Sequence, residues 1–83
     1  MMLGVDEKQF AALIQALGSA VKSLRKSHDL TQEDMAYGSG LSVRHYQQLE
    51  AGGGNPTLKT IFSVASMFKL SASELLKKSE ETL

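Results

Sequence analysis

The sequence of 83 residues contains no cysteine, no tryptophan and a single proline. Without cysteine, disulfide bonds and thiolate metal sites are excluded, although the cellular compartment stays open. Glycine and proline are too few to indicate disorder, and the hydrophobic fraction of 42% is normal for a folded globular chain. A chain of this length forms one domain, whose small core is sufficient if most elements are short helices.

An excess of charge is also missing, because nine Lys and Arg residues balance nine Asp and Glu residues. Non-specific affinity for nucleic acid is mostly electrostatic, so this balance argues against a protein that coats nucleic acid indiscriminately. A sequence-specific DNA-binding protein needs only a few well-placed cations. No apolar run is long enough to span a membrane. Residues 10–20 resemble a signal-peptide core, but the acidic Asp6 and Glu7 precede them. We therefore expect a cytoplasmic chain without a membrane segment.

Helical periodicity is clear in the first third of the chain. We expect a helix from Asp6 to about residue 27, with a possible break at Gly18, since glycine weakens a helix by about 1 kcal/mol relative to alanine. Residues 1–5 and 79–83 are expected to be loose. The apolar positions that define the helical face are Phe10, Leu13, Ile14, Leu17, Val21 and Leu24.

Residues 31–50 predict two short helices joined by a tight turn. Thr31 can cap the first helix, and Asp34 places a carboxylate in its first turn. The Gly-Ser-Gly stretch at 38–40 ends this helix, because glycine accepts the left-handed conformation of a sharp exit. Leu41 in the turn is placed to pack back into the core.

The second helix of this pair divides into two faces. Ser42 can cap it, and Tyr46 and Leu49 share an apolar side that predicts core packing. The opposite side carries polar and aliphatic residues: Val43, Arg44, Gln47 and Gln48. This is a helix-turn-helix pattern, in which the second helix is free to enter a DNA major groove.

The remaining sequence predicts a loop and two more helices. The three glycines at 52–54 lack the Gly-Lys-Ser/Thr ending of a nucleotide-binding loop and indicate a flexible connector. Thr57 introduces a fourth helix, and Ser71 with Glu74 is a capping-box signature that opens a fifth. The expected buried stripe of the fourth helix is Leu58, Ile61, Val64, Ala65 and Phe68.

Several segments, in order along the chain, resemble the lambda-repressor/Cro type of helix-turn-helix domain, the Xre-like family. They are residues 24–25, 30–36, 39–42, 49–52, 55–61 and 71–76. The resemblance implies an all-α, compact five-helix lambda-repressor-like DNA-binding domain over residues 1–83. It also implies binding to a double-stranded DNA operator, usually as a homodimer.

The resemblance assigns DNA contacts to the second motif helix and its surroundings. Arg44 can form two hydrogen bonds with guanine, and Gln48 can do the same with adenine. Val43 can contact a thymine methyl group, and Gln47 nearby is a further base-reading residue. The positions expected at DNA phosphates are Gln32, Ser42, His45, Asn55, Thr57 and Lys59.

Two further contacts follow from the same resemblance. Arg25 and Glu50 occupy positions where an arginine of the first helix meets the end of the recognition helix, so we expect an ion pair. The dimer contact is expected on the fourth and fifth helices, at Phe62, Met67 and Leu76. The upstream apolar residues 10–14 should then fold back onto the C-terminal helix of their own chain, since a solvated apolar patch is a liability.

The chemistry of the side chains indicates no enzyme. His28 and His45 lie on different elements with no carboxylate or second histidine at ligand spacing, and no nucleophile–base pair is evident. No metal or cofactor is therefore expected. The leading interpretation is a sequence-specific transcriptional regulator, a small repressor or autoregulator, acting as a homodimer on a pseudo-palindromic operator. Open alternatives are the antitoxin partner of a cognate toxin, a restriction–modification controller protein and, more remotely, a protein-interaction module without DNA binding.

Overall fold

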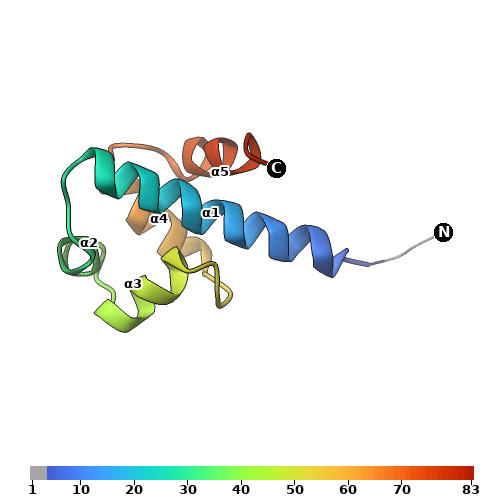
Figure 1. Cartoon of the computed structure of the whole chain (residues 1–83), viewed down its shortest axis with the longest axis horizontal. Helices are drawn as coiled ribbons and strands as arrows, with labels where there is room; N and C mark the ends of the chain where they lie inside the picture. The colour runs from blue at the N-terminus through green and yellow to red at the C-terminus, as the bar shows by residue number, and fades with distance from the viewer. Residues whose placement is uncertain (1–3) are drawn as a thin grey trace.

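The computed structural model describes residues 4–83, which form five helices and no strand. These are α1 (Glu7–Ser27), α2 (Gln32–Ser39), α3 (Val43–Glu50), α4 (Leu58–Ser66) and α5 (Ala72–Glu80). The expected all-α architecture of five helices is confirmed for the described residues. The long helix α1 crosses the molecule, with the other helices around its C-terminal part and its first turns projecting beyond them (Figure 1).

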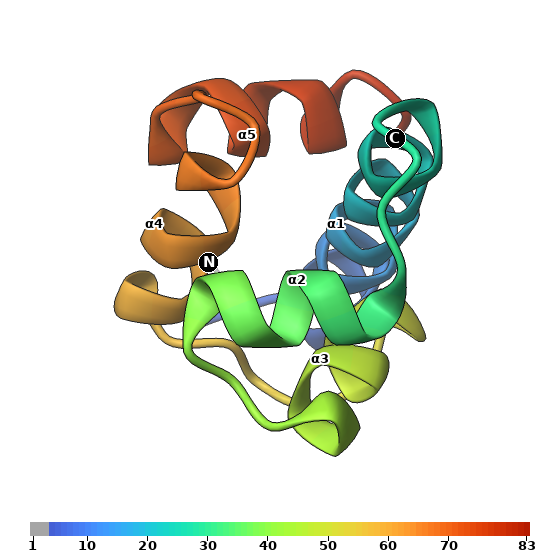
Figure 2. The same cartoon turned by 90° about the vertical axis from the view of Figure 1, so that its left-hand side faces the viewer.

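The five helices enclose one core. Contacts run from α1 to α5, from α5 to α4, from α4 to α2, from α2 to α3, and from α3 back to α1, so the helices close a ring (Figure 2). All five contribute fully buried side chains, among them Leu17, Val21, Met35, Tyr46, Val64 and Leu75. Tyr46 is thus a core residue, as its spacing from Leu49 predicts.

Local sequence sets the start of each helix. The N-cap side chains of Asp6, Thr31, Ser42, Thr57 and Ser71 all accept a backbone N–H of the first turn. Two of these ends are capping boxes. The Asp34 carboxylate accepts the Thr31 N–H at 2.9 Å, and the Glu74 carboxylate accepts the Ser71 N–H at 2.9 Å. Both expected caps are therefore confirmed, and the backbone hydrogen bonds lower the pKa of Asp34 and of Glu74.

The possible break at Gly18 does not occur, because α1 is continuous from Glu7 to Ser27. Gly18 lies where the C-terminal end of α3 crosses α1. A Cβ atom there would lie 2.6 Å from the Leu49 carbonyl oxygen and 2.7 Å from the Glu50 carbonyl oxygen. The glycine therefore allows two helix backbones to approach each other, rather than interrupting the helix.

The expectation that residues 79–83 are loose is wrong at its start. Helix α5 continues to Glu80, and Ser79 is fully buried with its hydroxyl donating to the Leu75 carbonyl at 2.9 Å. A serine that faces the core is tolerated because its hydroxyl finds this backbone acceptor. Of the N-terminal residues expected to be loose, 1–3 lie outside the described part of the chain.

The buried stripe expected on α4 is wrong at its first position. Ile61, Val64, Ala65 and Phe68 lie in or against the core, but the Leu58 side chain is 73% exposed. Thr60 takes the core-facing place in that first turn, where it is hydrogen-bonded to the Thr57 cap. Leu58 consequently shares an outward face with Phe62, which is 61% exposed.

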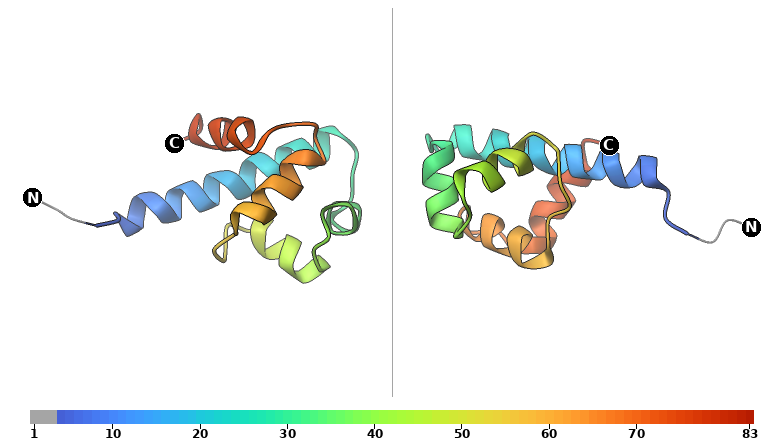
Figure 3. Two further views of the ribbon diagram at one scale, coloured as in Figure 1. Left: turned by 180° about the vertical axis from the view of Figure 1, so that it is seen from behind. Right: turned by 90° about the horizontal axis from the view of Figure 1, so that it is seen from below.

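The upstream apolar residues return to their own chain only in part. Ile14 is buried, whereas Phe10 is 37% exposed. Phe10 and Leu13 line a shallow hollow of about 580 Å³ together with Glu80 and Leu83 near the end of the chain. The first turns of α1 extend past the end of α5 (Figure 3), so α5 cannot cover them completely.

Candidate nucleic-acid interface

Helix α3 presents one face to the core and the other to solvent. Tyr46 and Leu49 are 0% and 3% exposed. The residues expected to read bases, Val43, Arg44, Gln47 and Gln48, are all exposed. The only carboxylate of α3, on Glu50, is buried, so the solvent side of this helix carries an arginine and no negative charge. A helix with this surface suits the negatively charged groove of a duplex.

The buried end of α3 is fixed to α1 by an ion pair. Arg25 Nε lies 2.7 Å from Glu50 Oε2, and Arg25 Nη2 lies 3.0 Å from Glu50 Oε1. The third guanidinium nitrogen, Nη1, donates to the Leu30 carbonyl at 3.0 Å. The expected ion pair is therefore present. Its side chains are 13% and 4% exposed, so solvent does little to screen it.

The surroundings of Glu50 keep its carboxylate charged. Burial by itself would raise the pKa of Glu50, but the hydrogen bonds that Arg25 and Gln32 donate help to hold the pKa below its ordinary value. The Tyr46 hydroxyl is buried beside this pair, and burial raises the pKa of Tyr46. At neutral pH the site contains a carboxylate that can only accept hydrogen bonds.

A chain of side-chain amides connects this buried carboxylate to the exposed face of α3. Gln32, the first residue of α2, donates from Nε2 to Glu50 Oε1 at 3.2 Å. Its oxygen Oε1 accepts from Gln47 Nε2 at 3.1 Å. The sequence places Gln32 at phosphates and Gln47 near bases, and the structure brings the two together. The family resemblance also expects Gln32 to brace the start of the recognition helix, but it does not name Gln47 and Glu50 as the partners, because these hydrogen bonds join residues of different helices.

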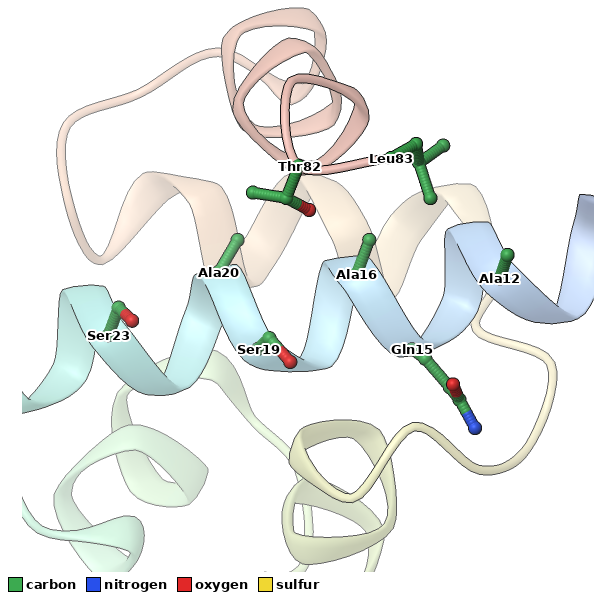
Figure 4. A pocket seen from close by; sticks show the side chains of 8 residues that line it. All are labelled: Ala12, Gln15, Ala16, Ser19, Ala20, Ser23, Thr82 and Leu83. Carbon is green, nitrogen blue, oxygen red and sulfur yellow. The ribbon is translucent and has the colours of Figure 1, made fainter.

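The three glycines after α3 form a tight turn, whose conformation the structure describes residue by residue. Gly52 and Gly54 have φ of 80° and 74°, a conformation that favours glycine. A Cβ on Gly52 would lie 3.0 Å from Gln15 Cγ, and Figure 4 shows Gln15 pointing from α1 toward this segment. A Cβ on Gly54 would lie 3.3 Å from Gln48 Cδ. The turn therefore packs against Gln48, one of the expected base readers.

The residues expected at phosphates lie at the start of α2, at the start of α3, and in the loop and first turn of α4. His45, Gln48 and Asn55 line one small hollow, so the loop before α4 is adjacent to α3. Ser42 and Thr57 are N-caps, each accepting a backbone N–H through its hydroxyl oxygen. Lys59 is exposed in the first turn of α4, while Gln32 is half-buried at the start of α2. Helix N-termini such as these present free backbone N–H groups to anions.

Other features of residues 4–83 bear on whether the chain could hold a metal ion or a ligand. Among residues 4–83 no group of three His, Asp or Glu side chains could hold a metal ion. A hollow of about 470 Å³ along α1 is lined by alanines and serines together with Gln15, Thr82 and Leu83, as Figure 4 shows. His28 Nδ1 lies 2.8 Å from the Leu24 carbonyl, at the end of α1. In the described part of the chain, no helix is long and apolar enough to cross a membrane.

Comparison with known proteins agrees with this geometry. The HTH_3 family model, described as helix-turn-helix, matches residues 21–75. The uncharacterized HTH-type transcriptional regulator y4dJ of Sinorhizobium fredii is 36% identical over 80% of this chain and 86% of its own length. The cryptic phage CTXphi transcriptional repressor RstR of Vibrio cholerae is 32% identical over 78% of this chain and 59% of its own length.

Two solved structures share the fold at low sequence identity. The clp gene regulator ClgR of Corynebacterium glutamicum superposes with a TM-score of 0.79 at 26% identity, covering 84% of this chain and 74% of that protein. The restriction-modification controller protein C.AhdI of Aeromonas hydrophila gives a TM-score of 0.71 at 29% identity, covering 75% and 94%. From the capped motif helices, the family match and these relatives together, the chain belongs to the HTH_3 helix-turn-helix family of DNA-binding transcriptional regulators and is not an enzyme.

Proposed function

We propose that this protein is a sequence-specific repressor or autoregulator that binds a pseudo-palindromic operator as a homodimer, with α3 in the major groove. The observation that supports the proposal is that α3 is fixed to the body of the domain on one side and exposed to solvent on the other. Its end is fixed by the Arg25–Glu50 pair, while Arg44, Gln47 and Gln48 are exposed on a face without carboxylates. A rigid helix that presents such side chains can read base edges with little loss of side-chain order.

Base reading and phosphate contacts are divided between two sets of residues. In this proposal Arg44 donates hydrogen bonds to guanine O6 and N7, and Val43 contacts a thymine methyl group. Gln47 and Gln48 form hydrogen bonds with neighbouring base edges. Phosphates are bound around α3 by the remaining set: Gln32, Ser42, His45, Asn55, Thr57 and Lys59. The Ser42 oxygen accepts the His45 N–H at 3.0 Å, which leaves its own O–H to donate to a phosphate.

The dimer contact is proposed on the outer face of α4. Leu58 and Phe62, one turn apart, are 73% and 61% exposed, and a partner would remove both from water. Leu76 is half-buried on α5 and remains in the proposed contact. Met67 contributes least, since it already packs against the core and its thioether covers Gly38. Two recognition helices about one DNA turn apart predict half-site centres roughly 34 Å apart.

A second candidate is a controller protein of a restriction–modification operon. It is favoured by the likeness to C.AhdI, which covers 94% of that controller protein. Both candidates bind an operator through α3, and they differ in the genes that the operator controls. Genomic footprinting distinguishes them, because a controller protein occupies DNA next to restriction and modification genes.

The test of the proposal compares two cations with different expected roles. Arg44→Ala should weaken binding by roughly 5- to 150-fold and relax the preference at one base pair per half-site. Lys59→Ala should weaken binding to all sequences alike and reduce the dependence of affinity on salt. Gel shifts over a range of salt concentrations, with an operator found by selection from random DNA, measure both effects.

The same assay has outcomes that contradict the proposal. Unchanged base preference in Arg44→Ala would remove the guanine-reading role, and a footprint on a single asymmetric half-site at full affinity would remove the paired operator. Absence of salt-dependent DNA binding would favour a protein-interaction module. Co-purification of a small partner protein would point to the antitoxin of a cognate toxin.

A further inference from the structure

The shallow hollow between the first turns of α1 and the end of α5, here called the terminal hollow, has an apolar floor. Phe10 and Leu13 come from α1, and Leu83 follows α5. Phe10 and Leu83 are 37% and 66% exposed, and the volume of the hollow is about 580 Å³. Because α1 projects past the end of α5 (Figure 3), these side chains stay partly open to solvent. A partner that covered them would remove apolar surface from water.

The charged side chains that line the terminal hollow are both acidic. Asp6 is the N-cap of α1, and Glu80 is the last residue of α5. Asp6 Oδ1 accepts the backbone N–H groups of Lys8 and Gln9 at 3.0 and 3.2 Å, which leaves Oδ2 to accept another donor. Neither carboxylate forms an ion pair with a lysine or arginine of residues 4–83. The hollow therefore places two carboxylates without cationic partners beside an apolar floor.

The sequence around the terminal hollow adds to its negative charge. Residues 5–13 and 79–83 contain four carboxylates, on Asp6, Glu7, Glu80 and Glu81, against the single cation of Lys8. The solvent face of α3, in contrast, carries an arginine and no carboxylate. Figure 1 shows the first turns of α1 projecting away from α3. The two regions therefore attract partners of opposite charge.

This charge decides among the possible occupants of the terminal hollow. The carboxylates of Asp6 and Glu80 repel DNA phosphates and anionic lipid headgroups. A second copy related by a two-fold axis at the hollow would bring the same carboxylates against each other, because an isologous contact pairs a surface with itself. A small molecule would stay largely exposed, since the hollow is shallow. The occupant that fits is a protein segment with an apolar face and flanking cations.

We infer that the terminal hollow binds a basic amphipathic helix of another protein. Apolar side chains one turn apart on such a helix cover Phe10, Leu13 and Leu83, which is the geometry of a helix bound in a groove. A lysine or arginine beside them lays its aliphatic stem along the apolar floor and brings its charge to Asp6 or Glu80. This contact leaves the exposed face of α3 uncovered, so the inference goes beyond the proposed function and does not depend on it.

A synthetic helical peptide of about 18 residues tests the inference, since shorter helices are marginal in water. Leucines at positions i, i+3, i+4 and i+7 form its apolar face, and lysines occupy the flanking positions. One control peptide has glutamate in place of every lysine, and a second has the same composition in an order without an apolar face. Fluorescence anisotropy measures affinity, and ¹⁵N–¹H NMR spectra of the full chain locate the contact.

The expected result is a contact confined to the terminal hollow. Addition of the lysine peptide should shift the signals of residues around Phe10, Leu13 and Glu80, and leave those around Leu58 and Phe62 unchanged. The outer face of α4 is the matched comparison, because it exposes two large apolar side chains on a helix without a carboxylate. Both control peptides should bind at least about tenfold more weakly than the lysine peptide.

Variants of the full chain separate the contribution of charge from that of apolar contact. Glu80→Gln should weaken binding of the lysine peptide about 2- to 5-fold, the worth of one exposed ion pair. Asp6→Asn should do the same while the N-cap is kept, since asparagine caps a helix as well as aspartate does. Phe10→Ser should weaken binding at least about 3-fold. The control Phe62→Ser, on α4, should change the affinity by less than about 1.5-fold.

Several results would overturn the inference. One is the absence of any signal shift at peptide concentrations up to about 1 mM, and another is a set of shifts centred on Leu58 and Phe62. Equal affinity for the lysine and glutamate peptides would show that charge plays no part. If sedimentation without peptide shows that Phe10→Ser dissociates an oligomer of the chain, the occupant is a second copy and the inference is wrong. None of these measurements includes DNA, so the operator assays judge the proposed function separately.

Discussion

The seam between α1 and α3, made by Gly18, Arg25, Leu49 and Glu50, contrasts with the outer α4 face made by Leu58 and Phe62. In the seam the two helix backbones approach so closely that no Cβ fits at Gly18, and the side chains of the Arg25–Glu50 pair are 13% and 4% exposed. On the outer α4 face two large apolar side chains are more than half exposed. In the seam, polar and apolar groups contact other groups of the same chain. On the outer α4 face, apolar surface is exposed to solvent.

This difference separates two tasks in one small domain. The seam fixes the recognition helix to the body, so changes there should lower the stability of the isolated domain. The outer α4 face contributes little to the folded chain by itself, so changes there should alter association instead. Variants that selectively affect stability or assembly test whether the two regions have these separate roles.

The largest loss of stability is expected when the ion pair is broken from one side. Arg25→Met leaves the Glu50 carboxylate buried without its partner and should lower the free energy of unfolding by about 3–5 kcal/mol. Urea denaturation measures the loss, and the exposed neighbour variant Lys26→Met serves as control, with an expected change within about 0.5 kcal/mol. A loss below about 1 kcal/mol for Arg25→Met would mean that the pair behaves like one at the surface.

A smaller loss is expected where the backbones touch. Alanine normally stabilises a helix interior by about 1 kcal/mol relative to glycine. Gly18→Ala should do the opposite and destabilise by about 1–3 kcal/mol, because its Cβ would overlap the Leu49 and Glu50 carbonyl oxygens. Thermal unfolding should show a lower Tm for Gly18→Ala and an equal or higher Tm for Ser19→Ala, its exposed neighbour. A rise in Tm for both variants would contradict the close packing.

The pH dependence of stability tests the charge in the seam. The pKa of Glu50 is lowered in the folded chain below the ordinary value of 4.5. Its stabilising contribution is therefore complete above that value and is lost as pH falls toward the folded pKa, because the unfolded chain then binds the proton more readily. Denaturation between about pH 3 and pH 7 should show a steeper acid loss in the unaltered chain than in Glu50→Gln. Parallel profiles would indicate that Glu50 gains nothing from its partners.

The smallest effect on stability is expected on the outer α4 face. Phe62→Glu should change the free energy of unfolding by no more than about 0.5 kcal/mol, because the side chain is 61% exposed. Sedimentation should nevertheless show a folded monomer, with much weaker operator binding. The matched variant Phe10→Glu, on the first turns of α1, should leave the dimer intact. If Phe10→Glu separates the subunits while Phe62→Glu does not, the interface lies on α1.

Features that depend on neighbours in the sequence could be predicted from the sequence alone. The caps at Thr31 and Ser71 involve partners three residues away, and Tyr46 and Leu49 share a face by helical spacing. The Arg25–Glu50 pair joins distant positions, and its prediction depends on the family resemblance and not on spacing. The DNA contacts themselves stay predictions.

Only the tertiary structure decided the features that depend on which segments meet. Gly18 looks like a weak point in a helix until the end of α3 is found against it. The neighbours of the glycine turn, Gln15 and Gln48, likewise come from other parts of the fold. The sequence determined where helices begin and which residues α3 exposes, because these follow from local hydrogen bonds and periodicity. The hydrogen bonds that join Glu50, Gln32 and Gln47 required the fold, because the chain alone does not place these three residues together.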